Sequence, residues 1–168
     1  MSNIAVLTSG GDSPGMNAAV MSVARCANRL DMPLIGIKRG YNGLLGRSGK
    51  LEDDFVRLDL DTVLDIADLP GTYLRTARCS EFMDPAVRER AAQRLRDMDV
   101  TGLVVIGGNG SFQGGRRLCM AVNAAAKCRC IAGDRAALQE QGAVFRHANA
   151  AAVAGGAVIL HGTAGDGQ

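Results

Sequence analysis

The sequence has no tryptophan, and only 4% of its 168 residues are aromatic. This disfavours recognition of single-stranded nucleic acid, in which bases stack on aromatic side chains. Neither sign of charge dominates, because 19 Lys and Arg residues are balanced by 17 Asp and Glu residues, which leaves a net charge of +2. Such a chain has no overall field that would draw it to nucleic acid or to a membrane surface.

Long apolar runs are missing near the start of the chain. Ile4–Leu7 is far shorter than the roughly 20 residues of a membrane helix, and no basic segment precedes it as in a signal peptide. We therefore expect a cytoplasmic protein with no membrane partner. The five cysteines are an odd number and indicate reduced thiols rather than a disulfide framework. Cys128 and Cys130 form a Cys-x-Cys pair, which is weak evidence for zinc because no second pair accompanies it.

What the chain does have is an alternation of short apolar runs and helical patterns. Ile4–Leu7 is typical of a buried strand that enters a tight turn at Ser9-Gly10-Gly11. A helix capped by Asp12 or Ser13 is expected next, with small and apolar residues at helical spacing as far as Ala27. Pro33–Ile37 is the next predicted strand. Strand, helix and strand in this order predict a βαβ unit with two parallel strands.

The middle of the chain is less regular. Residues 44–58 mix glycine, serine and charge, and we expect a loop there with room for one short hairpin. Short helices are predicted at Asp61–Leu69 and from Asp84-Pro85 to Met98. Leu103–Ile106 is apolar at every position, which indicates a strand covered on both sheet faces. It runs into Gly107–Ser111, and a helix through Leu118 follows.

Two glycine-rich turns thus follow two predicted strands and lead into helices. Glycine lets the backbone approach an anion closely, and the start of a helix offers free N–H groups and a positive dipole end. In an open parallel sheet, ligands collect at the carboxyl ends of the strands, where both turns would lie. The pair of turns therefore predicts a phosphate-binding site. Glycine at a strand end can also serve as a plain turn, and Ser111 can equally be the cap of the following helix.

Four segments in this order resemble one known family. Thr8–Ala19 is similar to the opening motif of phosphofructokinases, and Gly40–Leu44 is similar to the loop after their second strand. Gly71–Arg78 resembles the segment that ends in a phosphate-contacting arginine, and Val104–Ser111 resembles the Val-Ile-Gly-Gly-Asp-Gly-Ser motif. The resemblance covers Asn3 to about Met120. It implies an α/β fold: a Rossmann-like three-layer α/β/α domain with a mostly parallel sheet, incomplete relative to the full phosphofructokinase fold.

The resemblance also implies which residues contact the nucleotide. Position by position, these are Gly11, Tyr41, Arg78, Cys79, Gly108, Asn109, Gly110 and Ser111. The Arg78 guanidinium can donate two hydrogen bonds to phosphate oxygens and so neutralise charge during phosphoryl transfer, although a solvated surface role is the default for any arginine. Gly110 leaves room where pyrophosphate-dependent relatives have an Asp, so ATP is expected.

Two implications of the resemblance concern metal and regulation. Asn109 stands where the ATP-dependent family usually has the Asp of its magnesium site, so Asn109 is the candidate for Mg²⁺, through an orienting contact to a metal-bound water. Met21 and Leu60 stand where relatives regulated by nucleotide have arginines, although Arg25 is retained. We therefore do not expect that regulation.

The tail departs from the family pattern. Residues 1–122 are predicted to form the nucleotide-binding part, and residues 123–168 an Ala- and Gly-rich tail that suits a truncation or a frameshift. Asp134 lies near the place of the family's general base but lacks its flanking motif, so we interpret it as a surface carboxylate. His147 and His161 have no catalytic neighbours in sequence and are expected to be ordinary histidines.

The sequence thus yields two hypotheses. The parent activity would be transfer of the ATP γ-phosphoryl group to fructose 6-phosphate in glycolysis, with no catalytic residue retained here and turnover impaired by loss of the sugar-binding and general-base segments. The alternative is a non-catalytic nucleotide-binding module or interaction fragment. The resemblance implies a homo-oligomer for the full-length family.

Overall fold

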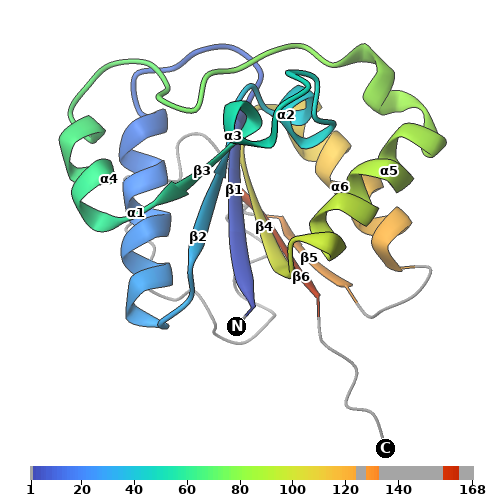
Figure 1. Ribbon diagram of the computed structural model, residues 1–168. Helices are drawn as coiled ribbons and strands as arrows, with labels where there is room; N and C mark the ends of the chain where they lie inside the picture. Colours follow the sequence, from blue (N-terminus) through green and yellow to red (C-terminus); the bar gives the residue numbers. More distant parts are fainter. Residues whose placement is uncertain (1, 124–127, 133–156, 163–168) are drawn as a thin grey trace, which may run out of the picture.

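The computed structural model describes residues 2–123, 128–132 and 157–162, which contain one six-stranded sheet (Figure 1). The strands follow each other across the sheet in the order β3-β2-β1-β4-β6-β5. Their bounds are β1 (Asn3–Ser9), β2 (Leu34–Ile37), β3 (Phe55–Leu58), β4 (Val100–Gly107), β5 (Cys128–Ala132) and β6 (Ala157–Gly162).

The sheet is parallel at its centre and antiparallel toward both edges. β1 pairs in parallel with β2 on one side and with β4 on the other. β3 runs antiparallel to β2, while β6 runs antiparallel to both β4 and β5. The predicted βαβ unit and its parallel strands are confirmed. Because β1 and β4 are parallel neighbours, with Ser9 in register with Gly107, their carboxyl ends lie at the same edge of the sheet.

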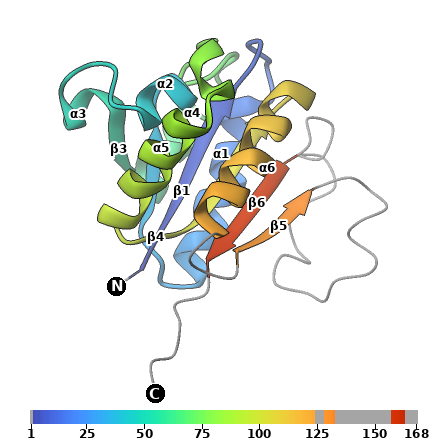
Figure 2. The ribbon, with the colours of Figure 1, turned by 90° about the vertical axis from the view of Figure 1, so that its right-hand side faces the viewer.

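Helices cover both faces of the sheet, so the predicted three-layer α/β/α architecture is confirmed. In Figure 1, α1 (Met16–Arg29) and α4 (Leu60–Ile66) lie on one side of the strands, and α5 (Pro85–Asp97) and α6 (Asn109–Asn123) lie on the other. Figure 2 shows α5 and α6 side by side in front of the sheet. Three shorter elements lie near the carboxyl edge or beside it: α2 (Tyr41–Leu44), α3 (Leu51–Asp54) and the 3-10 helix η1 (Ser80–Met83).

The central strands form two cores because alternate residues point to opposite faces. Ala5 and Leu7 pack with the side chains of α5 and α6, whereas Val6 packs with those of α1 and α4. None of these three residues is exposed to solvent. Burial of an aliphatic side chain such as Leu7 stabilises the fold by about 1.5–3 kcal/mol, so the two cores fix β1 and β4 firmly beneath the glycine turns.

The start of α1 differs from the prediction. Neither Asp12 nor Ser13 caps this helix: both are exposed, and Gly15 occupies the cap position without a side-chain hydrogen bond. The chain thus uses two more residues in the turn before it becomes helical. The start of α5 agrees with the prediction, because Asp84 caps it by accepting a hydrogen bond of 2.9 Å from the backbone N–H of Ala86.

The prediction of a loop with one short hairpin over residues 44–58 is correct only in part: residues 45–50 form turns and bends, but the remainder is regular structure. This segment contains α3 and the strand β3, which adds to the edge of the sheet beside β2. β3 is short and includes the exposed Arg57, so its side-chain pattern is weak. Its identity as a strand is set by backbone pairing, such as that of Leu58 with Leu34.

Within residues 2–123, 128–132 and 157–162, no helix has the length and apolar character needed to cross a membrane.

Candidate functional site

The two glycine turns meet at the carboxyl edge of the sheet. A Cβ atom placed on Gly10 would lie 3.4 Å from the Ser111 hydroxyl oxygen and 3.7 Å from the Gly108 backbone nitrogen. Gly10 also has a φ of 97°, which glycine adopts without strain. The turn after β1 and the turn after β4 therefore form one continuous backbone surface.

The outer residues of these turns face open space. A Cβ atom on Gly11, Gly108 or Gly110 would meet no atom within 4 Å, and all three residues are exposed. The backbone of both turns is thus accessible to a ligand. Asn109 and Gly110 form the first turn of α6, where N–H groups lack partners within the helix and the helix dipole is positive.

Ser111 is a buried support of this surface rather than a helix cap. The helix begins at Asn109, so Ser111 lies inside its first turn, and only 5% of the residue is exposed. Its hydroxyl oxygen lies against Gly107, where a Cβ atom would approach to 2.7 Å. Gly107 is therefore required for the close contact between β4 and α6. The interpretation of Ser111 as the cap is wrong.

Arg78 belongs to a third segment, residues 71–78, which is held by one side chain of α1 and one of β1. Asn17 of α1 donates its amide N–H to the Leu69 carbonyl at 3.0 Å and accepts from the Tyr73 N–H at 2.7 Å. Thr8, at the end of β1, donates to the Arg75 carbonyl at 3.0 Å and bonds to the Thr72 hydroxyl at 2.8 Å.

The same segment is fixed to α2. Asn42 donates its side-chain N–H to the carbonyl of Arg78 at 3.0 Å. The Arg78 backbone is therefore held in place while its guanidinium stays exposed to solvent. An arginine with this arrangement is available to an incoming anion.

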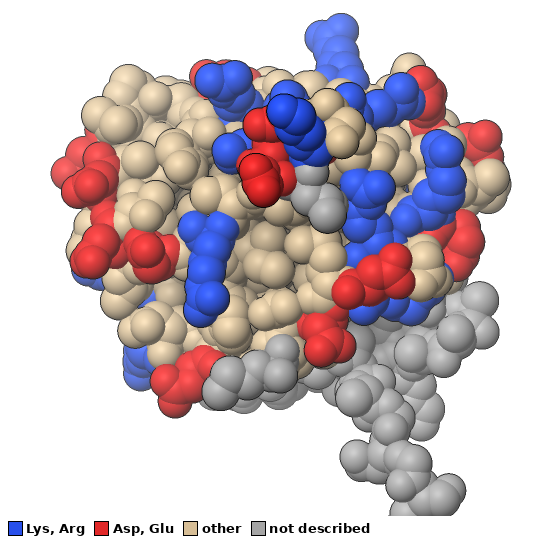
Figure 3. Space-filling model, in the orientation of Figure 1, with Lys and Arg blue, Asp and Glu red and all other residues tan. Residues whose placement is uncertain are grey.

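A cleft of about 380 Å³ lies beside Arg78. Its walls are Arg39, Asn42, Arg47, Arg78, Cys79, Ser80 and Glu81. Arg47 and Glu81 form an ion pair across it. We call this space the nucleotide cleft, because Arg78 and Cys79 in its walls are the residues that the family resemblance predicts to contact a nucleotide. Figure 3 shows most Lys and Arg side chains of this face over its upper and right-hand part, with Asp and Glu side chains among them, and a group of Asp and Glu side chains on the left, over α4.

Cys79 is half-buried in the wall of the nucleotide cleft. Burial raises the pKa of its thiol above the usual 9.0, because the thiolate loses solvation. The hydrogen bond from the Phe82 backbone and the charge of Arg47 lower this pKa but do not cancel the effect of burial. The thiol is therefore protonated at neutral pH and acts there as a wall of the cleft rather than as a nucleophile.

Tyr41 occupies a structural position within the site. It is only 5% exposed, its ring stacks on Phe82 with centroids 4.1 Å apart, and its hydroxyl donates to the Ser111 carbonyl. Tyr41 thus joins α2 to the glycine turn of α6. It connects the nucleotide cleft with the two turns, and the structure brings Gly11, Tyr41, Arg78, Cys79 and residues 108–111 to one edge of the sheet.

Within the described ranges, no group of three His, Cys, Asp or Glu residues comes together to bind a metal ion by side chains alone. Asn109 is exposed at the start of α6, beside the open backbone of Gly108 and Gly110. This arrangement fits a magnesium ion that is carried by phosphate oxygens and retains most of its water, since Mg²⁺ commonly binds in this way.

The sequence interpretation missed the residues that hold the site together. Thr8 and Asn17 lie inside the recognised opening motif, and their place beside the glycine turn in the sequence was an available signal; the structure shows both to be buried. Arg39 and Asp54 gave no local signal, because Arg39 lies just after a predicted strand and Asp54 lies in the segment taken for a loop. Asp134 and His147 lie outside the described residues, and the backbone of His161 is part of β6.

The three positions that align with effector-site arginines of regulated relatives have the burial expected for the residues found there. Met21 and Leu60 are partly buried and pack against the core beneath α1 and α4, while Arg25 is exposed on α1. No structural fact tests the expectation that nucleotide regulation is absent, which stays a prediction.

Known proteins match the same part of the chain. A family model described as "Phosphofructokinase" matches residues 3–133. The chain is 52% identical over 118 residues to the ATP-dependent 6-phosphofructokinase of Bacillus cytotoxicus, and this match covers 70% of the chain and 35% of the relative. The corresponding enzyme of Clostridium acetobutylicum is 51% identical with the same coverage. The chain thus spans about a third of the length of these curated relatives.

Solved structures agree with this result. Phosphofructokinase from Saccharomyces cerevisiae superposes with a TM-score of 0.63 at 38% identity, over 73% of this chain and 16% of that one. The T-state structure from Pichia pastoris gives a TM-score of 0.67 at 33% identity, over 75% of this chain and 14% of that one. On the match of residues 3–133 and on the shared fold, the chain belongs to the phosphofructokinase family.

Proposed function

We propose that the described part of this chain binds ATP between the two glycine turns and Arg78, as the nucleotide half of a 6-phosphofructokinase. The contact between the turns of Gly10 and Gly108 at one sheet edge carries the proposal. A triphosphate placed there meets two exposed backbone turns and the start of α6. In its parent activity, the γ-phosphoryl group of ATP passes to fructose 6-phosphate in cytoplasmic glycolysis.

Different residues would contact different parts of the nucleotide. The backbones of Gly11, Gly108 and Gly110 approach the phosphates without a Cβ atom in the way, and the Arg78 guanidinium neutralises phosphate charge. Cys79 and Asn42 border the remainder of the nucleotide in the cleft. Asn109 would help to hold magnesium through a water ligand, and magnesium bound with ATP would supply electrostatic stabilisation of the transferred phosphoryl group.

We further propose that this chain binds nucleotide with little or no turnover. Catalysis requires the acceptor hydroxyl, its base and the phosphoryl group in near-attack geometry. The stretch Cys130–Ala137 lacks the flanking motif of the family's base, and Asn109 replaces a magnesium-site carboxylate. The alternative function, a non-catalytic nucleotide-binding module, follows from the same observations. Assembly into oligomers, as in the full-length family, stays a prediction.

Calorimetric titration of the 168-residue chain with ATP, with and without magnesium chloride, tests binding. We expect saturable binding that magnesium alters. Arg78→Ala should weaken it about tenfold or more, because a charged hydrogen bond to phosphate contributes about 1.5–3 kcal/mol. Arg57→Gln is the matched control: Arg57 is exposed on β3 and lines neither cleft.

A coupled assay for fructose 1,6-bisphosphate separates the two functions. Binding without product supports the proposal of little or no turnover and is also what a nucleotide-binding module would give. Binding with product that Arg78→Ala reduces supports an active kinase and contradicts that proposal. If the chain melts cooperatively but does not bind ATP, both functions are refuted, because each requires a folded chain that binds the nucleotide.

A further inference from the structure

A second cleft lies next to the nucleotide cleft and is lined mainly by cationic side chains. Its volume is about 320 Å³, and its walls are Lys38, Arg39, Asp53, Tyr73 and Arg75. Arg39 borders both clefts. We call this second space the basic cleft. Three positive side chains and one carboxylate line it, so its lining carries an excess of positive charge.

Both arginines of the basic cleft have an unusual backbone conformation. Arg39 and Arg75 have φ angles of 60° and 61°, in the left-handed region that disfavours residues with a Cβ atom. Within the described ranges only two other non-glycine residues share it, Asp31 and Asp99. Both follow the C-terminal end of a helix, α1 or α5, where left-handed residues are common and Asp is tolerated. The arginines have no such helix end, and strain of this kind concentrates at functional sites.

Hydrogen bonds to neighbouring residues hold the backbones of Arg39 and Arg75 in place. The Arg39 N–H donates to the Leu74 carbonyl at 2.7 Å, directly before Arg75. The Arg75 carbonyl accepts from the Thr8 hydroxyl at 3.0 Å, and the Lys38 N–H donates to the Asp54 carbonyl at 2.8 Å. The cationic walls are therefore positioned before any ligand arrives, which lowers the entropic cost of binding.

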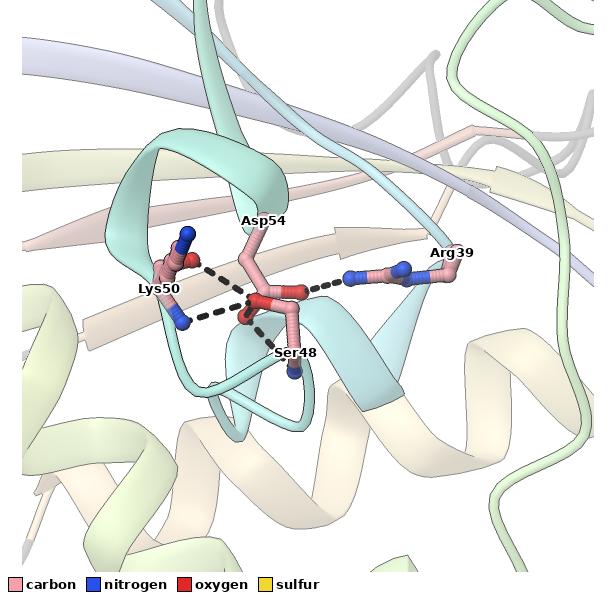
Figure 4. Close-up of polar contacts among 4 residues, drawn as sticks. All are labelled: Arg39, Ser48, Lys50 and Asp54. Atoms are coloured by element: carbon pink, nitrogen blue, oxygen red, sulfur yellow. Dashed lines mark hydrogen bonds and ion pairs between the residues drawn. The ribbon is translucent and has the colours of Figure 1, made fainter.

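The charges in the basic cleft are unequally neutralised. Arg39 pairs with the carboxylate of Asp54, whose side chain is fully buried and also accepts hydrogen bonds from Ser48 (Figure 4). This pair holds the Arg39 guanidinium at the cleft wall. In the described part of the chain, neither Lys38 nor Arg75 forms an ion pair. These two cations remain available to an anion.

We propose that the basic cleft binds the phosphate group of a small phosphate monoester, at a site separate from the nucleotide cleft. Lys38 and Arg75 supply the charge for a dianion, and the volume suits a small metabolite. The Asp53 carboxylate can accept a hydrogen bond from a hydroxyl group on the organic part of the ester, and it repels a more highly charged ligand. The proposal does not depend on ATP binding in the nucleotide cleft.

The test uses titration of the 168-residue chain with inorganic phosphate and with glycerol 3-phosphate, at constant ionic strength set by chloride. We expect both probes to bind, the ester more tightly. Arg75→Gly removes the guanidinium and suits the left-handed backbone, so the variant should keep its melting temperature while phosphate affinity falls about tenfold. Lys38→Gln should also weaken binding.

Two control variants separate charge from backbone effects. Asp99→Gly relieves a left-handed residue far from the basic cleft, and Arg57→Gln removes an exposed cation outside it. Both should leave phosphate affinity within about twofold, because surface substitutions of this kind are nearly neutral. A wild-type chain that binds phosphate no better than chloride overturns the proposal. So does loss of phosphate binding in Arg78→Ala but not in Arg75→Gly, because the phosphate would then lie in the nucleotide cleft.

Discussion

Cys79 illustrates how position sets the chemistry of a single residue. Its thiol lies in the wall of the nucleotide cleft, half-buried, with a pKa raised by loss of solvation. A thiolate reacts with alkylating agents and a thiol does not, so the reactivity of this residue reports both burial and ligand binding.

We predict that alkylation of Cys79 by iodoacetamide is slow at neutral pH and reaches half its maximal rate above pH 9.0. The measurement uses a chain in which the other four cysteines are replaced and follows labelling by mass spectrometry over a pH series. Saturating ATP should slow labelling further if the nucleotide lies in the cleft. A midpoint below pH 9.0 would contradict the burial effect.

Asp54 is the second residue whose surroundings decide its role. Its side chain is fully buried and accepts hydrogen bonds from Arg39, from the Ser48 backbone N–H at 3.2 Å and from the Ser48 hydroxyl. One carboxylate thus joins the loop before α3 to the end of β2. Its loss leaves partly buried donors without an acceptor, which costs more than the hydrogen bonds contribute on balance.

We expect Asp54→Asn to lower the free energy of unfolding by about 1–3 kcal/mol, since the charge that satisfies Arg39 and Ser48 is removed. Urea denaturation followed by circular dichroism measures the change. The control is Glu52→Gln on the same short helix, where the exposed side chain should change stability by less than about 0.5 kcal/mol. Equal stability of Asp54→Asn and the wild type would show that the contacts contribute little.

At the scale of elements, the helix α4 is capped by an ionisable residue, Asp59. The Asp59 side chain accepts a hydrogen bond of 2.8 Å from the Thr62 N–H at the start of the helix. The hydrogen bond with the Thr62 side chain, together with this backbone bond, lowers the pKa of Asp59 below its usual value of 3.8. The carboxylate form is therefore favoured by folding, and its contribution to stability is present above pH 3.8 and is lost as the pH falls through the lowered pKa.

We predict that Asp59→Ala lowers the melting temperature at pH 7 and that its difference from the wild type shrinks as the pH falls below 3.8. Thermal melts of both chains over a pH series measure this difference. Asp61→Asn provides the comparison, because Asp61 is exposed in the same first turn without the capping bond. A difference that persists unchanged at the acid end would exclude the carboxylate as its source.

Gly36 shows how one strand positions residues 71–78. A Cβ atom on this residue of β2 would lie 2.7 Å from Leu74, 2.9 Å from Leu58 and 3.0 Å from Val56. The absence of a side chain lets the buried Leu74 pack directly on the strand. Leu74 in turn precedes Arg75, so Gly36 helps to place residues 71–78 at the sheet edge.

We expect Gly36→Ala to lower the free energy of unfolding by about 1–3 kcal/mol through overpacking. The same variant should weaken ATP binding, because the segment that carries Arg78 would shift. Gly11→Ala is the opposite case: its new Cβ atom meets nothing within 4 Å, so stability is kept while ATP binding falls. Denaturation and calorimetry on both variants check the two effects, and an unperturbed Gly36→Ala would show that Leu74 can move aside freely.

At the scale of the whole molecule, the sequence predicted what depends on local pattern. The runs of β1 and β4 are apolar at successive positions and end in glycine, so both strands and their turns were visible in advance. β3 was missed because Phe55–Leu58 is a short edge strand defined by its pairing with β2. The left-handed backbone of Arg39 and Arg75 was also hidden, since arginine has no preference for it and only contacts between distant segments impose it.

The position of β1 between β2 and β4 predicts how stability is distributed. The backbone of β1 pairs on both sides, and its apolar residues are buried in both cores. Amide hydrogens of Ala5, Val6 and Leu7 should therefore exchange more slowly than those of the edge strand β3, because they open only on global unfolding. Hydrogen exchange followed by NMR measures this, and equal protection of the two strands would contradict it.

The parallel pairing of β1 with β4 also has a consequence during synthesis. The register that joins Ser9 to Gly107 connects segments almost a hundred positions apart, and such distant pairings form slowly. A ribosome must release β4 before the first strand gains its second neighbour. Until then, the apolar side of the nascent β1–β2 pair is a surface that chaperones would recognise.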